Sequence, residues 1–179
     1  MTSSQLVPTT TAAPFDRAAL ESLYLRLERR VYNVVYRWLW NRDDAADVTQ
    51  DAFVKLWSMR DRVRPETVEA LVFRIAVNLA SNRRRTRRLW SLVTLDALTL
   101  STPPPELDDT QRRVRAAVDA LPERLRRVVV LGELSGMTAK EIGAVLGIPE
   151  GTVASRRHAA VAILREQLGA LMEAHDDPA

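Results

Sequence analysis

Hydrophobic residues recur at three- and four-residue steps between residues 15 and 40. This spacing places them along one face of an α-helix. The positions are Leu20, Leu23, Leu27, Val31, Val34, Val35 and Trp38. Asp16 lies near the start of the segment, where a carboxylate interacts favourably with the helix dipole, and Asn41 ends it. The pattern predicts a first helix over residues 15–40.

A second helix is predicted from Asp43 or Asp44, either of which can serve as its N-cap, to about Trp57. Its inward positions are Ala45, Val48, Ala52, Phe53, Leu56 and Trp57. The opposite face is a mixed acidic and apolar strip made of Asp47, Gln50, Asp51 and Val54. Taken alone, this strip is most simply interpreted as an ordinary solvated helix face.

A loop over residues 58–66, with Pro65 and mixed charges, leads to a third helix over about residues 67–88. The first half of this helix is apolar along one stripe, and Asn78 and Asn82 share a side because they lie four residues apart. The second half is strongly basic and contains Arg83, Arg84, Arg85, Arg87 and Arg88. Five arginines exceed what helix capping needs, and an anionic polymer such as nucleic acid would relieve their repulsion. The alternative is a solvated, partly frayed helix end.

Helical periodicity is lost between residues 89 and 110, where the run Pro103–Pro105 cannot occupy a helix interior. This segment is predicted to be a flexible linker between domains, and its apolar residues favour contact with a groove on a partner. Residues 1–14, rich in Thr, Ser, Ala and Pro, and residues 172–179 are predicted to be tails.

Helical patterns return in the last third of the chain and predict a helix-turn-helix. A short helix stops at Pro122, whose fixed φ suits the first turn of the helix that follows. Gly136 then breaks the chain, residues 138–141 form a capping box, and Gly147 stands at a turn before the last helix. This spacing makes residues 151–168 the expected recognition helix of a DNA-binding domain, although plain helical hairpins share the pattern.

The predicted fold is therefore all-α, with two small helical domains, residues 15–88 and 111–171, joined by a flexible linker. A chain of 179 residues with 46% hydrophobic content can form two small cores. The absence of cysteine excludes disulfides and thiolate metal sites, and the well-separated His158 and His175 argue against a histidine site, so no metal or cofactor is expected. No stretch is apolar enough to span a membrane and no secretion signal is evident, so a soluble cytoplasmic protein is expected.

Several motifs together resemble the extracytoplasmic-function (ECF) group of the sigma-70 family of bacterial sigma factors. Residues 44–57, DAADVTQDAFVKLW, are similar to a signature of sigma region 2, and residues 74–80, RIAVNLA, resemble its following helix. Region 4 is resembled by residues 121–124, 141–143 and 151–156. Each motif is weakly specific by itself, but their order and spacing are specific together, and the resemblance covers about residues 15–168.

The resemblance implies a factor that binds core RNA polymerase and directs promoter-specific transcription initiation. The acidic strip of the second helix would dock on the clamp coiled coil of the polymerase. The loop, with Arg62 and Arg64, and the helix carrying Asn78 and Asn82 would melt and read the −10 element, the loop holding a flipped base. The arginine run would hold phosphates and so supply affinity and orientation but little sequence information.

The second domain would grip the polymerase flap and read the −35 element with its last helix. The implied DNA contacts of that helix are Thr152, Ser155, Arg156, Arg157 and His158. The linker would thread towards the RNA exit path. An anti-sigma factor is a further implied partner, and insertion into a membrane is not implied.

The sequence departs from the family pattern at several positions. Ala46 replaces a common Glu in the acidic strip, and Leu71 stands where Trp is usual. Ala154 and Ala159 occupy positions that are often basic and face DNA, and Arg157 lies where a buried Leu is expected. Two expected contacts to the −35 element are therefore missing.

Two other classes of protein fit parts of the pattern. A helix-turn-helix repressor or activator with a ligand-sensing front half would dimerise and bind a palindromic duplex without core polymerase. A helical adaptor would only hold a partner protein. An enzyme is not expected, because paired carboxylates such as Asp44 and Asp47 lie on a helix face without histidines or a glycine loop.

Overall fold

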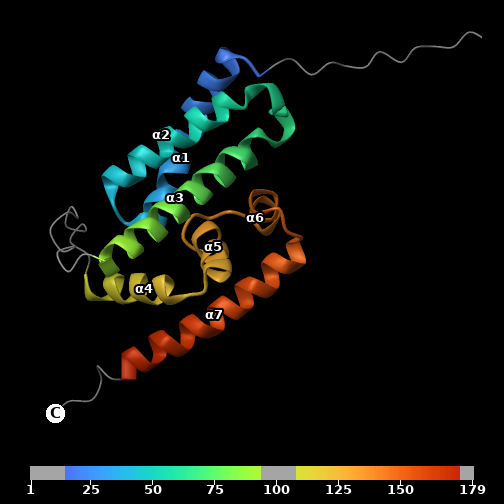
Figure 1. Cartoon of the computed structure of the whole chain (residues 1–179). Coiled ribbons are helices and arrows are strands. Elements are labelled where there is room, and N and C mark those ends of the chain that lie inside the picture. Colours follow the sequence, from blue (N-terminus) through green and yellow to red (C-terminus); the bar gives the residue numbers. More distant parts are fainter. Residues whose placement is uncertain (1–14, 94–107, 174–179) are drawn as a thin grey trace, which may run out of the picture.

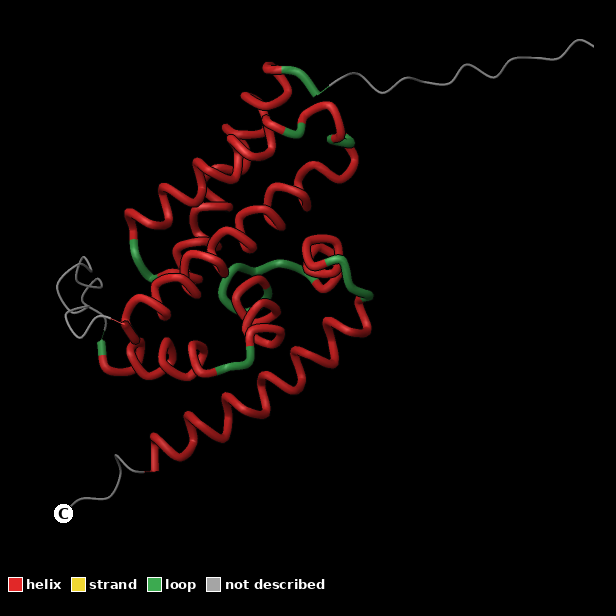
Figure 2. The backbone as a smooth tube through the Cα atoms, in the orientation of Figure 1, coloured by secondary structure: helices red, strands yellow, loops and turns green. Residues whose placement is uncertain are grey.

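The computed structural model describes residues 15–93 and 108–173, with the backbone alone at 91–93 and 170–173. These parts of the chain are helical and contain no strand, as Figures 1 and 2 show. The first half consists of α1 (Arg17–Leu39), α2 (Arg42–Ser58) and α3 (Val68–Val93), with two short 3₁₀ turns, Arg60–Arg62 and Pro65–Thr67, between α2 and α3. The second half consists of α4 (Asp109–Ala120), α5 (Glu123–Leu131), α6 (Ala139–Leu146) and α7 (Glu150–Glu173).

Helices α1, α2 and α3 pack on one another around a shared core. The stripe predicted on α1 is buried, and Val31, Val35 and Trp38 are at most 2% exposed. Leu56 from α2 and Val72 from α3 complete the centre of this core and are fully buried. The predicted inward face of α2 is confirmed at every position except Trp57, which is half-buried.

The helix caps between α1 and α2 differ from those predicted. Asn41, and not Asp43 or Asp44, is the N-cap of α2, since its side-chain oxygen accepts a hydrogen bond from the Asp44 backbone N–H at 2.8 Å. Trp40 ends α1 in the left-handed conformation, with φ 53°. An amide side chain at position 41 can cap as well as a carboxylate, and Asp44 is thereby available for another contact.

The third helix extends further than its predicted end. It runs to Val93, so residues 89–93 belong to α3 rather than to the segment that sequence periodicity assigned to the linker. Residues 94–107, which hold the proline run, lie outside the described residues, as do the tails over 1–14 and 174–179. Leu89 and Trp90, in the last turns of α3, are 58% and 61% exposed.

The predicted helix-turn-helix is present in the second half. Thr138 and Glu141 form the capping box of α6, with the Glu141 carboxylate accepting from the Thr138 backbone N–H at 2.8 Å. Gly147 ends α6 with a left-handed φ of 68°, a conformation that glycine adopts at little cost. Pro122 is the N-cap of α5 rather than its first helical residue. Helix α7 begins three residues after Gly147 and lies along the outer side of this half (Figure 1).

The two halves pack directly against each other. In Figure 1, α5 and α6 lie between α3 and α7, and α4 lies below the end of α3. The core is continuous, because Leu125, Val128 and Val129 of α5 belong to the same cluster of buried residues as Val31 and Trp38 of α1. The described residues are therefore arranged as one body with two helical subdivisions.

Candidate functional site

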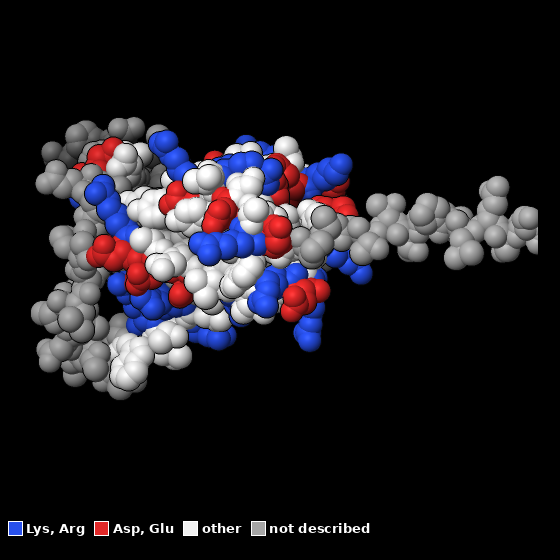
Figure 3. Space-filling model, turned by 90° about the horizontal axis from the view of Figure 1, so that it is seen from above, with Lys and Arg blue, Asp and Glu red and all other residues white. Residues whose placement is uncertain are grey.

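The acidic strip of α2 is exposed as predicted. Asp47, Gln50, Asp51 and Val54 all lie on the solvent side of the helix, and Val54 is 60% exposed. Acidic and basic side chains are interspersed over the face of the molecule seen in Figure 3. An exposed apolar residue between carboxylates can contact the aliphatic stem of a basic side chain on a partner, while the carboxylates pair with its charged head.

Asp44 neutralises two members of the arginine run. Its Oδ1 lies 2.9 Å from Arg83 Nη2, and its Oδ2 lies 2.8 Å from Arg87 Nη1. The approach of Arg87 is off the hydrogen-bonding direction, so this second contact is mainly electrostatic. Arg83 also lies 3.5 Å from Asp47. Part of the repulsion that the sequence attributed to unbalanced arginines is therefore relieved within the chain, by a residue that had been expected to cap α2.

The remaining arginines of the run lie in different surroundings. Arg84 reaches α4, where its Nη2 lies 3.1 Å from Asp119 Oδ1. Arg85 donates to the Asn82 side-chain oxygen at 3.2 Å, so an arginine and a predicted base-reading amide are adjacent on one helix. Arg88 is exposed at the next turn. The run thus splits into a pair tied to α2, one residue tied to α4 and two residues on the solvent side of α3.

Asn78 is exposed on α3 but is engaged by the second half of the chain. Its side-chain oxygen accepts a hydrogen bond from Arg127 Nη1 of α5 at 3.2 Å, and Ser81 Oγ lies 3.4 Å from Arg127 Nη2. Arg127 is itself held by Glu123 at 2.7 Å. The hydrogen bond from Arg127 lowers the pKa of the Glu123 carboxyl below its usual value. Sequence reasoning missed Arg127, which follows Arg126 in the charged first half of α5 and carried no signal that distinguished it from its neighbours.

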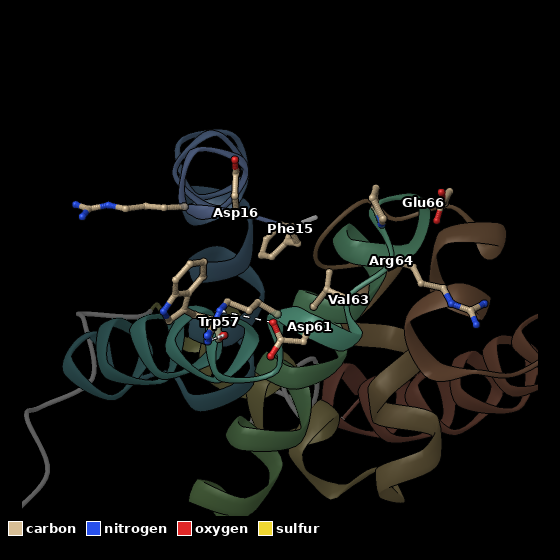
Figure 4. Close-up of a pocket in the computed structure, with 10 residues that line it drawn as sticks. Phe15, Asp16, Trp57, Asp61, Val63, Arg64 and Glu66 are labelled. Atoms are coloured by element: carbon tan, nitrogen blue, oxygen red, sulfur yellow. Dashed lines mark hydrogen bonds and ion pairs between the residues drawn. The ribbon is translucent and has the colours of Figure 1, made fainter. Parts of the chain in front are cut away.

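The predicted loop encloses a hollow of about 630 Å³ against the start of α1. Figure 4 shows Phe15 and Val63 directed towards each other, with Trp57 and Asp61 beside them and Arg64 directed away. Phe15 is only 8% exposed, and the Arg60 guanidinium lies over the Trp57 ring at 4.9 Å. The hollow therefore combines aromatic walls with the exposed Asp61 carboxylate. Sequence reasoning missed Phe15, which had been assigned only to the first helix. Arg62 does not line the hollow but lies exposed in the first 3₁₀ turn.

The recognition helix presents the predicted residues unequally. Ser155 and His158 are exposed, whereas Thr152 and Arg156 are half-buried. Ser155 Oγ donates to the Thr152 carbonyl of its own helix at 3.1 Å.

Arg157 faces a second hollow, of about 620 Å³, between α5, α6 and α7. Its Nε lies 2.5 Å from Glu133, and Val128, Met137 and Ile142 line the same hollow. Where the family pattern has a buried Leu, this chain places an arginine stem beside apolar side chains with its charge paired at the rim.

Two kinds of feature are absent from the described residues. They contain no group of three or more His, Cys, Asp or Glu side chains that could hold a metal ion. None of the helices described is long and apolar enough to cross a membrane.

Comparison with known families explains both halves of the structure. Residues 23–89 match the family model described as Sigma-70 region 2, and residues 111–164 match the model described as Sigma-70, region 4. The chain belongs to the ECF sigma factors of the sigma-70 family. This family is in general not one of enzymes. Region 2 of the sigma factor is thus built by α1 to α3, and region 4 by α4 to α7.

Curated relatives and solved structures agree with this assignment. The sigma factor is 35% identical to the ECF RNA polymerase sigma factor SigE of Mycolicibacterium smegmatis, over 90% of this chain and 68% of the relative. It is 31% identical to the ECF RNA polymerase sigma-E factor of Escherichia coli, over 79% and 82% of the two chains. The structure of CnrH in complex with the cytosolic domain of CnrY matches with a TM-score of 0.66 and 28% identity, over 87% of this chain and 90% of CnrH.

A further solved structure shares the fold. It is that of the sigma factor RpoE in complex with the anti-sigma factor NepR from Bartonella quintana. The TM-score is 0.63, the identity is 22%, and the match covers 84% of this chain and 97% of that one.

Proposed function

We propose that this sigma factor binds core RNA polymerase through the acidic strip of α2, and that it uses α3 with the adjoining loop for the −10 element and α7 for the −35 element. The exposure of the strip carries the proposal. Asp47, Gln50, Asp51 and Val54 remain in solvent although the opposite face of their helix is packed on α1 and α3. Exposed apolar and acidic side chains on a rigid helix suit a partner with basic side chains.

Charge reversal in the strip tests the polymerase contact. Asp47→Arg with Asp51→Arg should abolish capture of core polymerase in a pull-down while circular dichroism stays unchanged, because exposed substitutions usually alter stability little. The matched control is Glu21→Arg with Glu166→Arg, an equal change in charge at exposed positions of α1 and α7. Undiminished capture by the strip variant would disprove the assignment.

The alternative function, a repressor or activator that acts without polymerase, predicts a different behaviour. Such a protein should shift a duplex promoter fragment on a gel by itself. A sigma factor should bind the duplex poorly alone and shift it strongly only after core polymerase is added. Family membership favours the sigma factor, and omission of core polymerase from the same binding reaction separates the two.

For the −10 element, the hollow beside the loop suits an extruded base. The half-buried Trp57 offers aromatic surface for stacking, which is worth roughly 1–3 kcal/mol per base and can offset the cost of flipping. Asn82 on α3 offers an amide to a base edge, and Arg85 beside it offers charge to a phosphate. Asn82→Ala should change the preferred −10 sequence. Arg85→Ala should instead weaken all promoters similarly and reduce the salt slope by about one.

Region 4 supplies the proposed −35 contacts from the exposed side of α7. Ser155 and His158 are best placed to reach base edges, and Thr152 and Arg156 can reach the flanking backbone. Arg157 is directed to Glu133 instead and contributes less. Region 4 is proposed to contact the flap of the polymerase. Residues 94–107 are proposed to run towards the RNA exit path.

An anti-sigma factor is the proposed regulator, since a structural relative is a sigma factor bound to an anti-sigma factor. The cytoplasm, where bacterial RNA polymerase works, is the proposed location. Co-purification of the full chain with tagged core polymerase from a bacterial lysate tests the polymerase partner.

A further inference from the structure

The side of α3 that is proposed to read bases continues beyond Asn82. Asn78, Asn82, Arg85 and Leu89 follow one another at steps of four, three and four residues. At 3.6 residues per turn, this spacing keeps their side chains within an arc of about 60° on one face of the helix. All four residues are exposed. The face that carries the two amides therefore runs on past Arg85 and reaches an apolar side chain.

Leu89 lies on the solvent side of α3 and not on its apolar stripe. Its side chain is 58% exposed, whereas Val72 and Ala76 of the stripe are fully buried. A leucine in a row of amides and an arginine contributes nothing to the core and keeps its apolar surface in water. Such a side chain gains free energy when a partner covers it, so it is a candidate for a contact on this face.

The direction of α3 relative to the promoter follows from the order of the chain. Residues 94–107 connect the end of α3 to region 4, which is proposed to read the −35 element. Because the −35 element lies upstream of the −10 element, the end of α3 is expected to point upstream of the bases that face Asn82. Leu89 follows Asn82 by seven residues. This separation is a rise of about 10 Å along the helix, or roughly three base pairs of DNA.

The chemistry of the row suits DNA. Arg85 lies between Asn82 and Leu89 and is exposed, so its guanidinium can bind a phosphate while it donates to the Asn82 side-chain oxygen at 3.2 Å. The apolar group that a base edge presents in the major groove is the C5-methyl group of thymine. A leucine one turn beyond a phosphate-binding arginine can contact that methyl group, which the other three bases lack.

We propose that Leu89 extends promoter recognition upstream of the −10 element by apolar contact with the methyl group of a thymine, roughly three base pairs from the base that faces Asn82. This inference rests on the proposed −10 role of α3 and adds a specificity-determining residue to it. A methyl contact carries sequence information, unlike the phosphate contacts of the arginines. Promoters of this sigma factor should therefore favour thymine at that upstream position.

The test removes the methyl group from the DNA and the leucine from the protein, separately and together. Core polymerase loaded with the full chain is titrated with fluorescent fork DNA, and anisotropy measures the affinity. The fork joins a single-stranded −10 element, selected by this holoenzyme from a random library, to an upstream duplex of about eight A·T pairs, more than twice the expected reach. Each thymine of the duplex is replaced in turn by deoxyuridine, which lacks only the methyl group. A second probe exchanges the two strands of the duplex, and neither probe contains a −35 element.

The methyl contact predicts a response at one position of the duplex. Deoxyuridine there should weaken binding of the parent roughly threefold, as expected for one buried methyl group. The same replacement should have no effect on Leu89→Ala, because the side chain that contacts the methyl group is gone. Alanine is the better helix former, so this variant should keep α3 and its affinity for the −10 single strand without duplex.

Trp90→Ala is the matched control for the position of the contact. Trp90 is the next residue of α3 and is 61% exposed, but it lies about 100° further around the helix than Leu89. This variant should therefore keep the response to deoxyuridine. Loss of the response in Trp90→Ala would assign the effect to the end of the helix as a whole and overturn the role of Leu89.

Three further outcomes would overturn the inference. They are a parent holoenzyme that ignores every deoxyuridine, an undiminished response in Leu89→Ala, and equal weakening of Leu89→Ala on the −10 single strand without duplex. The proposed function fails in a different way, because a parent holoenzyme without preference among −10 sequences would contradict the role of α3 itself. A parent that reads the −10 element but ignores the upstream methyl groups would contradict only the contact by Leu89.

Discussion

Asp44 of α2 holds Arg87 of α3 with its Oδ2 2.8 Å from the guanidinium Nη1. Its other oxygen contacts Arg83 at 2.9 Å, and only 12% of the Asp44 side chain is exposed. One carboxylate thus ties the helix proposed to bind polymerase to the helix proposed to bind DNA. Asp44 therefore links α2, which carries the acidic strip, to the arginine-rich end of α3.

Asp44→Asn should destabilise the sigma factor by about 1.5–3 kcal/mol, the usual worth of hydrogen bonds to charged groups. The amide preserves the shape of the side chain but removes the Asp44 charge from Arg87 and leaves Arg83 with only its longer contact to Asp47, at 3.5 Å. Urea unfolding followed by circular dichroism measures the change. Asp51→Asn, on the exposed side of α2, is the control and should stay within about 0.5 kcal/mol of the parent. Equal stability of the two variants would show that the pairing with Asp44 contributes little.

Gly143 allows the turn of the helix-turn-helix to close. A Cβ at this position would lie 2.8 Å from the Ile148 backbone oxygen, which cannot move without opening the turn. Gly143→Ala should therefore cost about 1–3 kcal/mol in unfolding free energy and weaken duplex binding in the presence of polymerase. Gly151→Ala is the matched control, since no atom lies within 4 Å of its Cβ, and alanine should stabilise the helix there by up to about 1 kcal/mol. A fully stable Gly143→Ala protein would contradict the close approach.

Arg157 lies at the edge of the hollow between α5, α6 and α7, beside apolar side chains. Arg157→Leu should bury its side chain beside Val128, Met137 and Ile142 and raise the unfolding free energy by about 1 kcal/mol, although it breaks the pair with Glu133. Thermal unfolding measures the gain. Arg157→Gln removes the charge without adding apolar surface, so it should not stabilise. If both variants destabilise the protein equally, the charge pair outweighs the burial.

Glu141 should make the stability of region 4 dependent on acid. The hydrogen bond from the Thr138 backbone N–H, aided by the Thr138 hydroxyl, lowers the pKa of the Glu141 carboxyl below 4.5. A lowered pKa means that the contribution is fully present above the unfolded value and is lost as the pH falls through the folded value. The difference in Tm between the parent and Glu141→Gln should therefore be largest near neutral pH and vanish in acid below 4.5. A constant difference across that range would assign the effect to packing instead.

Local chemistry fixed much of this structure in advance. The three- and four-residue spacing of apolar residues determined α1, α2 and most of α3. This spacing gives a helix one apolar face, and the helix is stable when that face is buried in the core. The capping box at Thr138 and the left-handed Gly147 determined the ends of α6, since both act within a few residues. The family motifs are likewise short and local, which is why regions 2 and 4 could be recognised from the residues alone.

Only the tertiary structure decided which charges meet. Asp44 lies 39 residues from Arg83, and Arg127 lies 49 from Asn78, so no periodicity connects them. The arginine run consequently looked like one uniform patch, whereas the structure divides it between α2, α4 and solvent. Arg126 lies in a charged stretch of α5, and only the packing of the two halves buries it against Trp38 of α1. Packing of one region on the other depends on the shape and charge of two complete surfaces, and that information exists only once both regions have folded.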